Sequence, residues 1–97
     1  MNLVATQLGN ANLSDQVLSV VVRDREGILF EGEAESLTSI NDTGAFDVLP
    51  LHANFISIIN QKITLRLPGG GVQNLPLKVG IIKVQENNIE VYLGIVH

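Results

Sequence analysis

The sequence predicts an all-β domain, an antiparallel β-sandwich or flattened barrel, from three observations. Apolar and polar residues alternate over short segments, and turn-forming residues separate these segments at close intervals. No window of a dozen residues shows the 3.6-residue apolar period of a capped helix. Because 97 residues leave room for one core, we expect a single domain over residues 17–97, preceded by a polar arm or lead-in over residues 1–16.

The first strands follow from alternation in the first half of the chain. Residues 18–24 ("LSVVVRD") are rich in β-branched side chains, and residues 28–40 ("ILFEGEAESLTSI") alternate. In the second segment Glu31, Glu33 and Glu35 share one parity, so a period of two places the three carboxylates on one face, toward water. A solvated strand face explains this row better than paired general acids do.

The second half of the chain predicts further strands separated by two turns. The strands are expected at residues 55–59, 62–67, 72–85 and 89–96. The turns are expected at "PGGG" (68–71) and "ENN" (86–88), because glycine and asparagine tolerate positive φ.

Composition excludes several classes of function. The net charge is −4, and the six Lys and Arg residues are scattered, so nothing forms the basic stripe that nucleic acids or anionic membranes need. The chain has no cysteine, which excludes disulfide scaffolds. No signal peptide is visible, and clusters such as "VLSVVV" are far shorter than the roughly 20 residues of a membrane span. The mean hydropathy of +0.29 favours an exposed apolar partner surface.

His52 is the single internal histidine and lies in the apolar stretch "LPLHANFISII". A hydrolase would pair it with a nucleophile, but no G-x-S-x-G elbow is present. A metal site would use Asp42 and Asp47, which flank a nearby turn, although ordinary turn acids explain them better. The residues alone leave two interpretations, a structural histidine beside the turn at Pro50 or a surface histidine at a binding site.

The glycine-rich stretch "PGGGVQN" is not a phosphate loop. It lacks the Lys-Ser/Thr pair that reaches the phosphates, and no helix is expected after it. We therefore expect no cofactor, no metal and no catalytic residue in this chain.

Two stretches resemble the N-terminal β-sandwich domain of the epsilon subunit of F-type ATP synthase, which is called delta in mitochondria. "EGILFEGEAESLTSINDTGAFDVLPLHANFIS" matches the family's (V/I)-F-S-G-E-A segment and its I-L-P-G-H-A-P signature, at Phe30, Gly32, Glu33, Ala34, Gly44, Leu49, Pro50, His52 and Ala53. "KVGIIKVQENNIEVYLGIV" matches the S-G-G-(F/I)-L-E-V-x-x-N-x-V-T-V-L segment, at Gly80, Val84, Gln85, Asn88 and Val91. The resemblance covers residues 17–96.

The chain departs from the family pattern at the signature itself. Leu51 replaces the glycine before the histidine, and Asn54 replaces the proline after His-Ala. Other departures are Ala45, Asp47 and Val79. The family's C-terminal helical hairpin, which inhibits ATP hydrolysis and in some members binds ATP, has no counterpart in the 97 residues, so we carry over neither role and expect no nucleotide binding.

The resemblance implies a non-catalytic central-stalk subunit of a rotary ATP synthase. Such a domain binds the gamma subunit, rests on the polar loops of the c-ring and couples rotation to ion translocation. It lies peripherally at the cytoplasmic face of the cell membrane and does not insert into it. On this basis we expect the partner-docking residues to be Leu49, Pro50, Leu51, His52, Ala53 and Asn54. The alternatives are a free-standing β-sandwich adaptor and a small metal-binding domain centred on His52.

Overall fold

The computed structural model describes residues 17–94, which form seven β-strands and no helix. The strands are β2 (Leu18–Asp24), β3 (Gly27–Ala34), β4 (Ser36–Asn41), β5 (Gly44–Val48), β6 (Phe55–Arg66), β7 (Val72–Gln85) and β8 (Asn88–Leu93). The predicted all-β fold is confirmed. No helix long and apolar enough to cross a membrane occurs between residues 17 and 94. The arm predicted at residues 1–16 lies outside the described residues.

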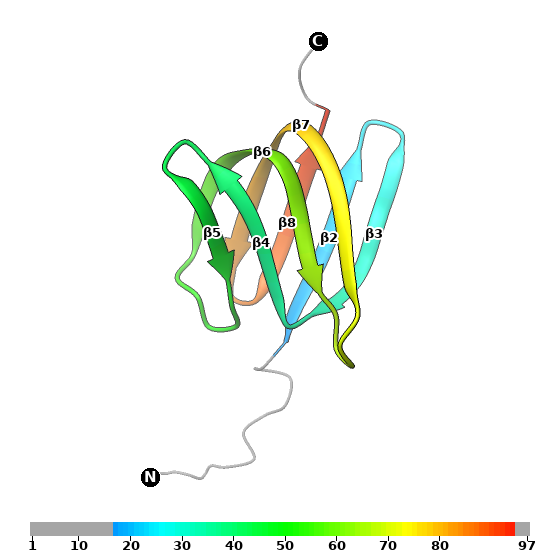
Figure 1. The fold of residues 1–97 in the computed structure, drawn as a ribbon, viewed down its shortest axis with the longest axis vertical. Coiled ribbons are helices and arrows are strands. Elements are labelled where there is room, and N and C mark those ends of the chain that lie inside the picture. Colours follow the sequence, from blue (N-terminus) through cyan, green and yellow to red (C-terminus); the bar gives the residue numbers. More distant parts are fainter. Residues whose placement is uncertain (1–16, 95–97) are drawn as a thin grey trace, which may run out of the picture.

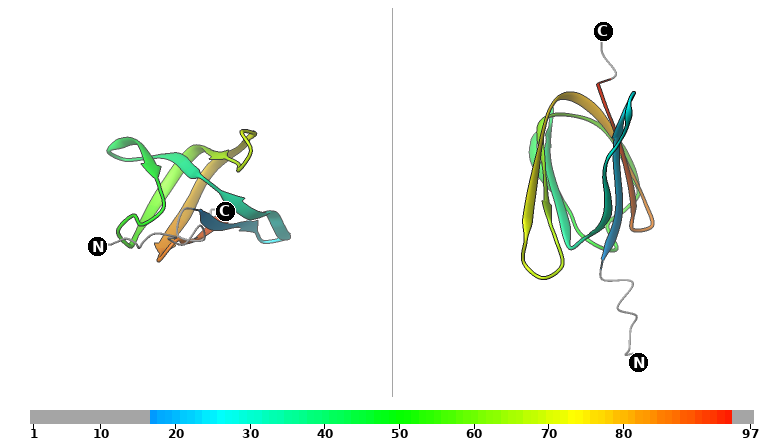
Figure 2. Two further views of the ribbon diagram at one scale, coloured as in Figure 1. Left: turned by 90° about the horizontal axis from the view of Figure 1, so that it is seen from below. Right: turned by 90° about the vertical axis from the view of Figure 1, so that its right-hand side faces the viewer.

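All the strands belong to one sheet, in the order β3-β2-β8-β7-β6-β4-β5. The long hairpin of β6 and β7 arches over, so that the two ends of the sheet face each other as the two layers of a sandwich (Figures 1 and 2). Of the six strand pairs that residues 18–93 form, five are antiparallel. The pair of β2 with β8 is parallel, where the sequence predicted an antiparallel sheet.

A bulge within β6 and β7 produces the bend. Asn60 pairs with Val79 while Gln61 pairs with Leu77, so Lys78 is an extra residue in the ladder. Gln61 has a φ of 74°, and such irregularities bend a strand and increase its twist. The segments predicted separately at residues 55–59 and 62–67 are therefore one continuous strand.

The core lies between the two layers and is built from alternate residues of every strand. In β8, Ile89, Val91 and Leu93 are buried while Glu90 and Tyr92 face outward. The buried apolar residues are Leu18, Val20, Val22, Ala34, Leu37, Val48, Ile59, Ile63, Leu65, Ile82, Val84, Ile89, Val91 and Leu93. Partly buried side chains, among them Phe46 and Phe55, extend this core.

The alternation over residues 28–40 belongs to two strands rather than one. Glu35 lies between β3 and β4, and its amide donates to the Arg66 carbonyl at 2.7 Å. The inward phase changes there, because Ala34 is buried on one side of the break and Leu37 on the other. Glu31 and Glu33 are exposed, as predicted.

Both predicted turns are present. The glycine-rich turn joins β6 to β7, and the Leu67 amide closes it on the Gly71 carbonyl at 2.7 Å. Glu86 and Asn87 join β7 to β8 with φ values of 52° and 68°, the pair of left-handed residues that a type I′ hairpin turn requires. Strand β5 was not predicted from the sequence.

Candidate functional site

The loop between β5 and β6, residues 49–54, presents apolar side chains to solvent. Leu51 is 77% exposed and Leu49 is 54% exposed. The His52 amide donates to the Leu49 carbonyl at 3.1 Å, which closes a tight turn around Pro50. Leu51 occupies the left-handed region, with a φ of 69°, a conformation that costs a branched side chain about 1–2 kcal/mol. We call residues 49–54 the 49–54 loop.

His52 is an exposed member of this loop and not a core residue. Its Nδ1 lies 2.8 Å from the Ala53 carbonyl. Because a carbonyl only accepts, Nδ1 is the donor in this bond. The ring packs against Phe55, with centroids 5.2 Å apart, and Phe55 meets Phe46 edge to face. The base of the loop therefore rests on an aromatic cluster that joins the core.

The 49–54 loop is tied to the β7–β8 turn by two hydrogen bonds. The Leu51 amide donates to Asn87 Oδ1 at 2.6 Å, and the Glu86 amide donates to Asn54 Oδ1 at 2.9 Å. The loop and the turn consequently lie together at the end of the sandwich where β2 begins (Figure 1).

An exposed apolar patch continues from the loop onto the outer face of the sheet. Ile56 and Ile58 of β6 are 69% and 62% exposed. Cross-strand pairing then sets Ile58 beside Ile81 and Ile81 beside Tyr92, so the row crosses β6, β7 and β8. We call Ile56, Ile58, Ile81 and Tyr92 the outer apolar patch. Arg23 closes the row, with its guanidinium carbon 5.8 Å from the centre of the Tyr92 ring.

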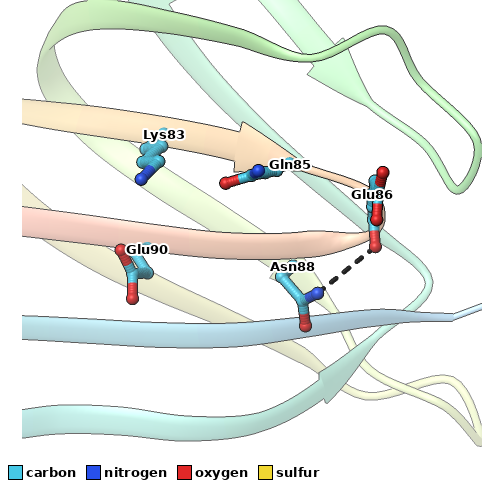
Figure 3. Close-up of a pocket in the computed structure, with 5 residues that line it drawn as sticks. All are labelled: Lys83, Gln85, Glu86, Asn88 and Glu90. Carbon is cyan, nitrogen blue, oxygen red and sulfur yellow. Dashed lines mark hydrogen bonds between the residues drawn. The ribbon is translucent and has the colours of Figure 1, made fainter.

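Polar side chains border the patch on the side of the β7–β8 turn. Lys83, Gln85, Glu86, Asn88 and Glu90 line a shallow hollow of about 260 Å³ (Figure 3). Asn88 Nδ2 donates to the Glu86 carbonyl at 3.4 Å within it. An apolar centre with a polar border is the usual arrangement of a protein–protein interface.

The residues considered for a metal site do not converge. Asp42 lies in the β4–β5 turn, at the opposite end of β5 from His52, and Asp47 accepts a hydrogen bond from Thr38 Oγ1 at 2.6 Å. Across residues 17–94, no three His, Asp or Glu side chains gather closely enough to hold an ion. The described part of the chain therefore gives no support to a His-centred metal-binding domain.

The family model for the β-sandwich domain of the ATP synthase delta/epsilon chain matches residues 9–94, almost the whole chain. The chain belongs to this family. The match confirms the resemblance drawn from the two sequence stretches, and it assigns the described sandwich to the domain that the family model represents.

Curated relatives carry the same family name. The ATP synthase epsilon chain of Nitratiruptor sp. is 35% identical over 63 residues, which cover 64% of this chain and 49% of the relative. The epsilon chain of Leptospira borgpetersenii is 30% identical over 74 residues, covering 76% of this chain and 58% of the relative. This epsilon-family chain thus spans about half to three-fifths of the length of these relatives.

Solved structures share the fold. A chain of the Euglena gracilis mitochondrial ATP synthase, determined as the OSCP/F1/c-ring assembly, superposes with a TM-score of 0.76 at 13% identity, covering 89% of this chain and 55% of that one. A chain of the Tetrahymena thermophila central stalk and c-ring gives a TM-score of 0.66 at 9% identity, covering 78% and 62%. At these identities the likeness shows that the epsilon-family sandwich fold is shared.

The structure adds residues that sequence reasoning missed. Ile56, Ile58 and Tyr92 were assigned to strands, but their exposure was not predicted. The segment "FISII" is apolar at nearly every position, so alternation could not separate its inward side chains from its outward ones. Asn87 was assigned only to a turn, because a contact between segments 36 residues apart leaves no local signal.

Proposed function

We propose that this domain is a non-catalytic part of the central stalk of an F-type ATP synthase. In this role it docks the gamma subunit onto the c-ring and helps to couple rotation to ion translocation. It would lie peripherally at the cytoplasmic face of the cell membrane as part of the complex. The observation that carries the proposal is the exposed pair Leu49 and Leu51, presented on a turn at one end of a sandwich that belongs to the epsilon family.

The chemistry of the surface supports a protein partner. The 49–54 loop runs directly into β6, where Ile56 is exposed, so apolar side chains face solvent at both an end and a flank of the sandwich. When a partner removes apolar side chains as exposed as Leu51 and Ile56 from water, the complex is stabilised by about 25 cal/mol per Å² of buried apolar area. Both of the similar structures are assemblies that include a c-ring, and one of them is a central stalk with its c-ring, which favours these partners for this chain as well.

The rigidity of the fold suits the transmission of torque. Every strand contributes to one packed core, and the bent hairpin of β6 and β7 belongs to both layers. A load applied at the 49–54 loop would therefore pass into the core through Phe55 and Phe46. Close-packed interiors have low compressibility and transmit such a load with little deformation.

The test is the double variant Leu51→Asp, His52→Ala, measured for binding to a subcomplex of the gamma subunit and c-ring that lacks this subunit. A carboxylate forced into an apolar contact costs a few kcal/mol. At about 1.4 kcal/mol per tenfold change, the dissociation constant should rise by roughly one to three decades. Because both side chains are exposed, the melting temperature of the free domain should stay close to that of the wild type.

The matched control is Leu29→Asp, the same change at an exposed leucine near the β2–β3 turn, at the other end of the sandwich (Figure 1). Leu29→Asp should bind the subcomplex like the wild type. Equal losses of affinity in both variants would show that the 49–54 loop is not the docking element. A folded wild-type domain that does not bind the subcomplex would overturn the stalk proposal and favour a free-standing adaptor.

A further inference from the structure

The two bonds between the 49–54 loop and the β7–β8 turn form a reciprocal pair. Each asparagine accepts, through its Oδ1, a main-chain amide of the other segment: Asn87 from Leu51 at 2.6 Å and Asn54 from Glu86 at 2.9 Å. The partners lie 36 and 32 positions apart in the sequence. We call this arrangement the asparagine latch.

The turn side of the latch is anchored in the sheet. The Asn87 carbonyl accepts the Ser19 amide of β2 at 2.8 Å, while its side chain accepts the Leu51 amide. The left-handed backbone of Asn87, with a φ of 68°, is a conformation that asparagine tolerates better than most residues. One residue therefore links the first described strand, the turn and the tip of the loop.

The loop side of the latch is where restraint is needed. Leu51 adopts a left-handed conformation that leucine disfavours, so without an external hold the loop would exchange this conformation for others. The family signature has proline at the position of Asn54 and glycine at that of Leu51. Glycine adopts the left-handed conformation without strain and proline fixes its own φ, whereas in this chain the bonds to Asn87 and Asn54 supply the hold.

We propose that Asn87 and Asn54 are positioning residues, which hold the 49–54 loop in its docking conformation before a partner binds. This inference rests on the proposed docking function. A loop that already occupies its bound conformation pays less ordering cost on association. The apparent dissociation constant equals the intrinsic one divided by the populated fraction of the competent conformation, so a tenfold fall in that fraction weakens binding by about tenfold.

The experiment compares Asn87→Gly with Asn87→Asp in the full chain. Glycine keeps the left-handed turn but removes the acceptor, whereas aspartate keeps an oxygen at the Oδ1 position. Amide hydrogen exchange followed by NMR should show Leu51 exchanging at least tenfold faster in Asn87→Gly and near the wild-type rate in Asn87→Asp. The amide of Val91 in β8 reports whether the core is unchanged.

Binding to the subcomplex of gamma and c-ring supplies the functional readout. Asn87→Gly should weaken binding by about five- to thirtyfold, and Asn87→Asp should restore most of it. Asn54→Ala should instead speed exchange of the Glu86 amide and weaken binding similarly, which tests the second half of the latch independently.

Two results would overturn the inference: an unchanged Leu51 exchange rate in Asn87→Gly, or unchanged binding despite faster exchange. Faster exchange of Val91 together with Leu51 would mean that the variant loosens the whole sandwich, and would also count against a positioning role. If the wild-type chain itself fails to bind the subcomplex, the proposed function fails, while the exchange rates still decide whether the asparagines hold the loop.

Discussion

Ser39 Oγ donates a hydrogen bond to the Lys62 carbonyl at 2.8 Å, at the point where β4 and β6 lose their regular pairing. Thr38 pairs with Thr64, but Ile40 pairs with Asn60, so the register shifts across Ser39. Ser39 is the one buried polar residue among residues 17–94, at 1% exposed. Its hydroxyl supplies the Lys62 carbonyl with a partner where the ladder is irregular.

Ser39→Ala should therefore lower the free energy of unfolding by about 0.5–1.5 kcal/mol, because it removes a part-buried hydrogen bond to the Lys62 carbonyl. Urea denaturation followed by circular dichroism measures the change. The control is Thr38→Val on the same strand, whose hydroxyl bonds Asp47 at an exposed position where water can replace it. A Ser39→Ala chain as stable as the wild type would contradict the role given to the hydroxyl.

Gly80 should not tolerate a larger residue. A Cβ at this position would lie 2.9 Å from the Tyr92 carbonyl oxygen and 2.9 Å from Leu93 Cδ2, and the first of these atoms belongs to the backbone of β8. We expect Gly80→Ala to cost about 1–3 kcal/mol of stability. Gly71→Ala is the matched control, because its Cβ would meet Leu67 Cδ1 at an ordinary 3.7 Å. Similar melting temperatures for the two variants would contradict the close approach.

Leu51→Gly should separate stability from docking. Glycine relieves the left-handed strain, which stabilises the folded state by about 1–2 kcal/mol. Its greater conformational freedom also stabilises the unfolded chain, by about 0.5–1 kcal/mol, and this offsets part of the gain. The net expectation is unchanged or slightly higher stability, together with weaker binding to the subcomplex of gamma and c-ring because the exposed side chain is lost. Leu49→Gly is the control. Leu49 does not have a positive φ, so glycine relieves no strain there and its extra freedom in the unfolded chain should lower stability. Tighter binding by Leu51→Gly would contradict apolar docking through this residue.

Isothermal titration of the chain with millimolar ATP should show no saturable heat. The glycine-rich segment is a hairpin turn in which the Gly70 amide already donates to the Leu67 carbonyl at 3.1 Å, and no helix follows it within the described residues. A phosphate loop instead presents an array of main-chain amides at the start of a helix. Saturation with a micromolar dissociation constant would contradict this expectation.

Local alternation was enough to predict the fold class, because a buried face imposes a period of two wherever a strand is half covered. Its limits appear at particular residues. The strand break at Glu35 is marked only by a slip of one residue in the alternation, which puts the buried Leu37 on the parity of the exposed glutamates, and a single continuous alternating segment over residues 28–40 passes over that slip. Strand β5 ("GAFDV") is short and contains Gly and Asp, which are depleted in strands, so no propensity marked it.

The candidate site was predictable only in part. The signature around His52 located the loop, and the Pro50 turn indicated that it lies between strands. The left-handed conformation of Leu51 and the bonds from Asn54 and Asn87 depend on which distant turn meets the loop. That meeting is set by the strand order of the completed sheet, which a single sequence does not display.

The parallel pairing of β2 with β8 has a consequence for how the protein is made. Val20 lies beside Ile89 and Val22 beside Val91. Strand β2 is synthesised before all the other described strands, but the edge that pairs with β8 stays uncovered until β8 has been made. Until then the described strands offer β2 only its hairpin with β3, and an isolated two-stranded hairpin is marginally stable in water. Pairings this distant in sequence carry a high loop-closure cost and slow folding. The nascent chain would thus expose this β-branched edge of β2 until β8, the last described strand, is free to pair with it.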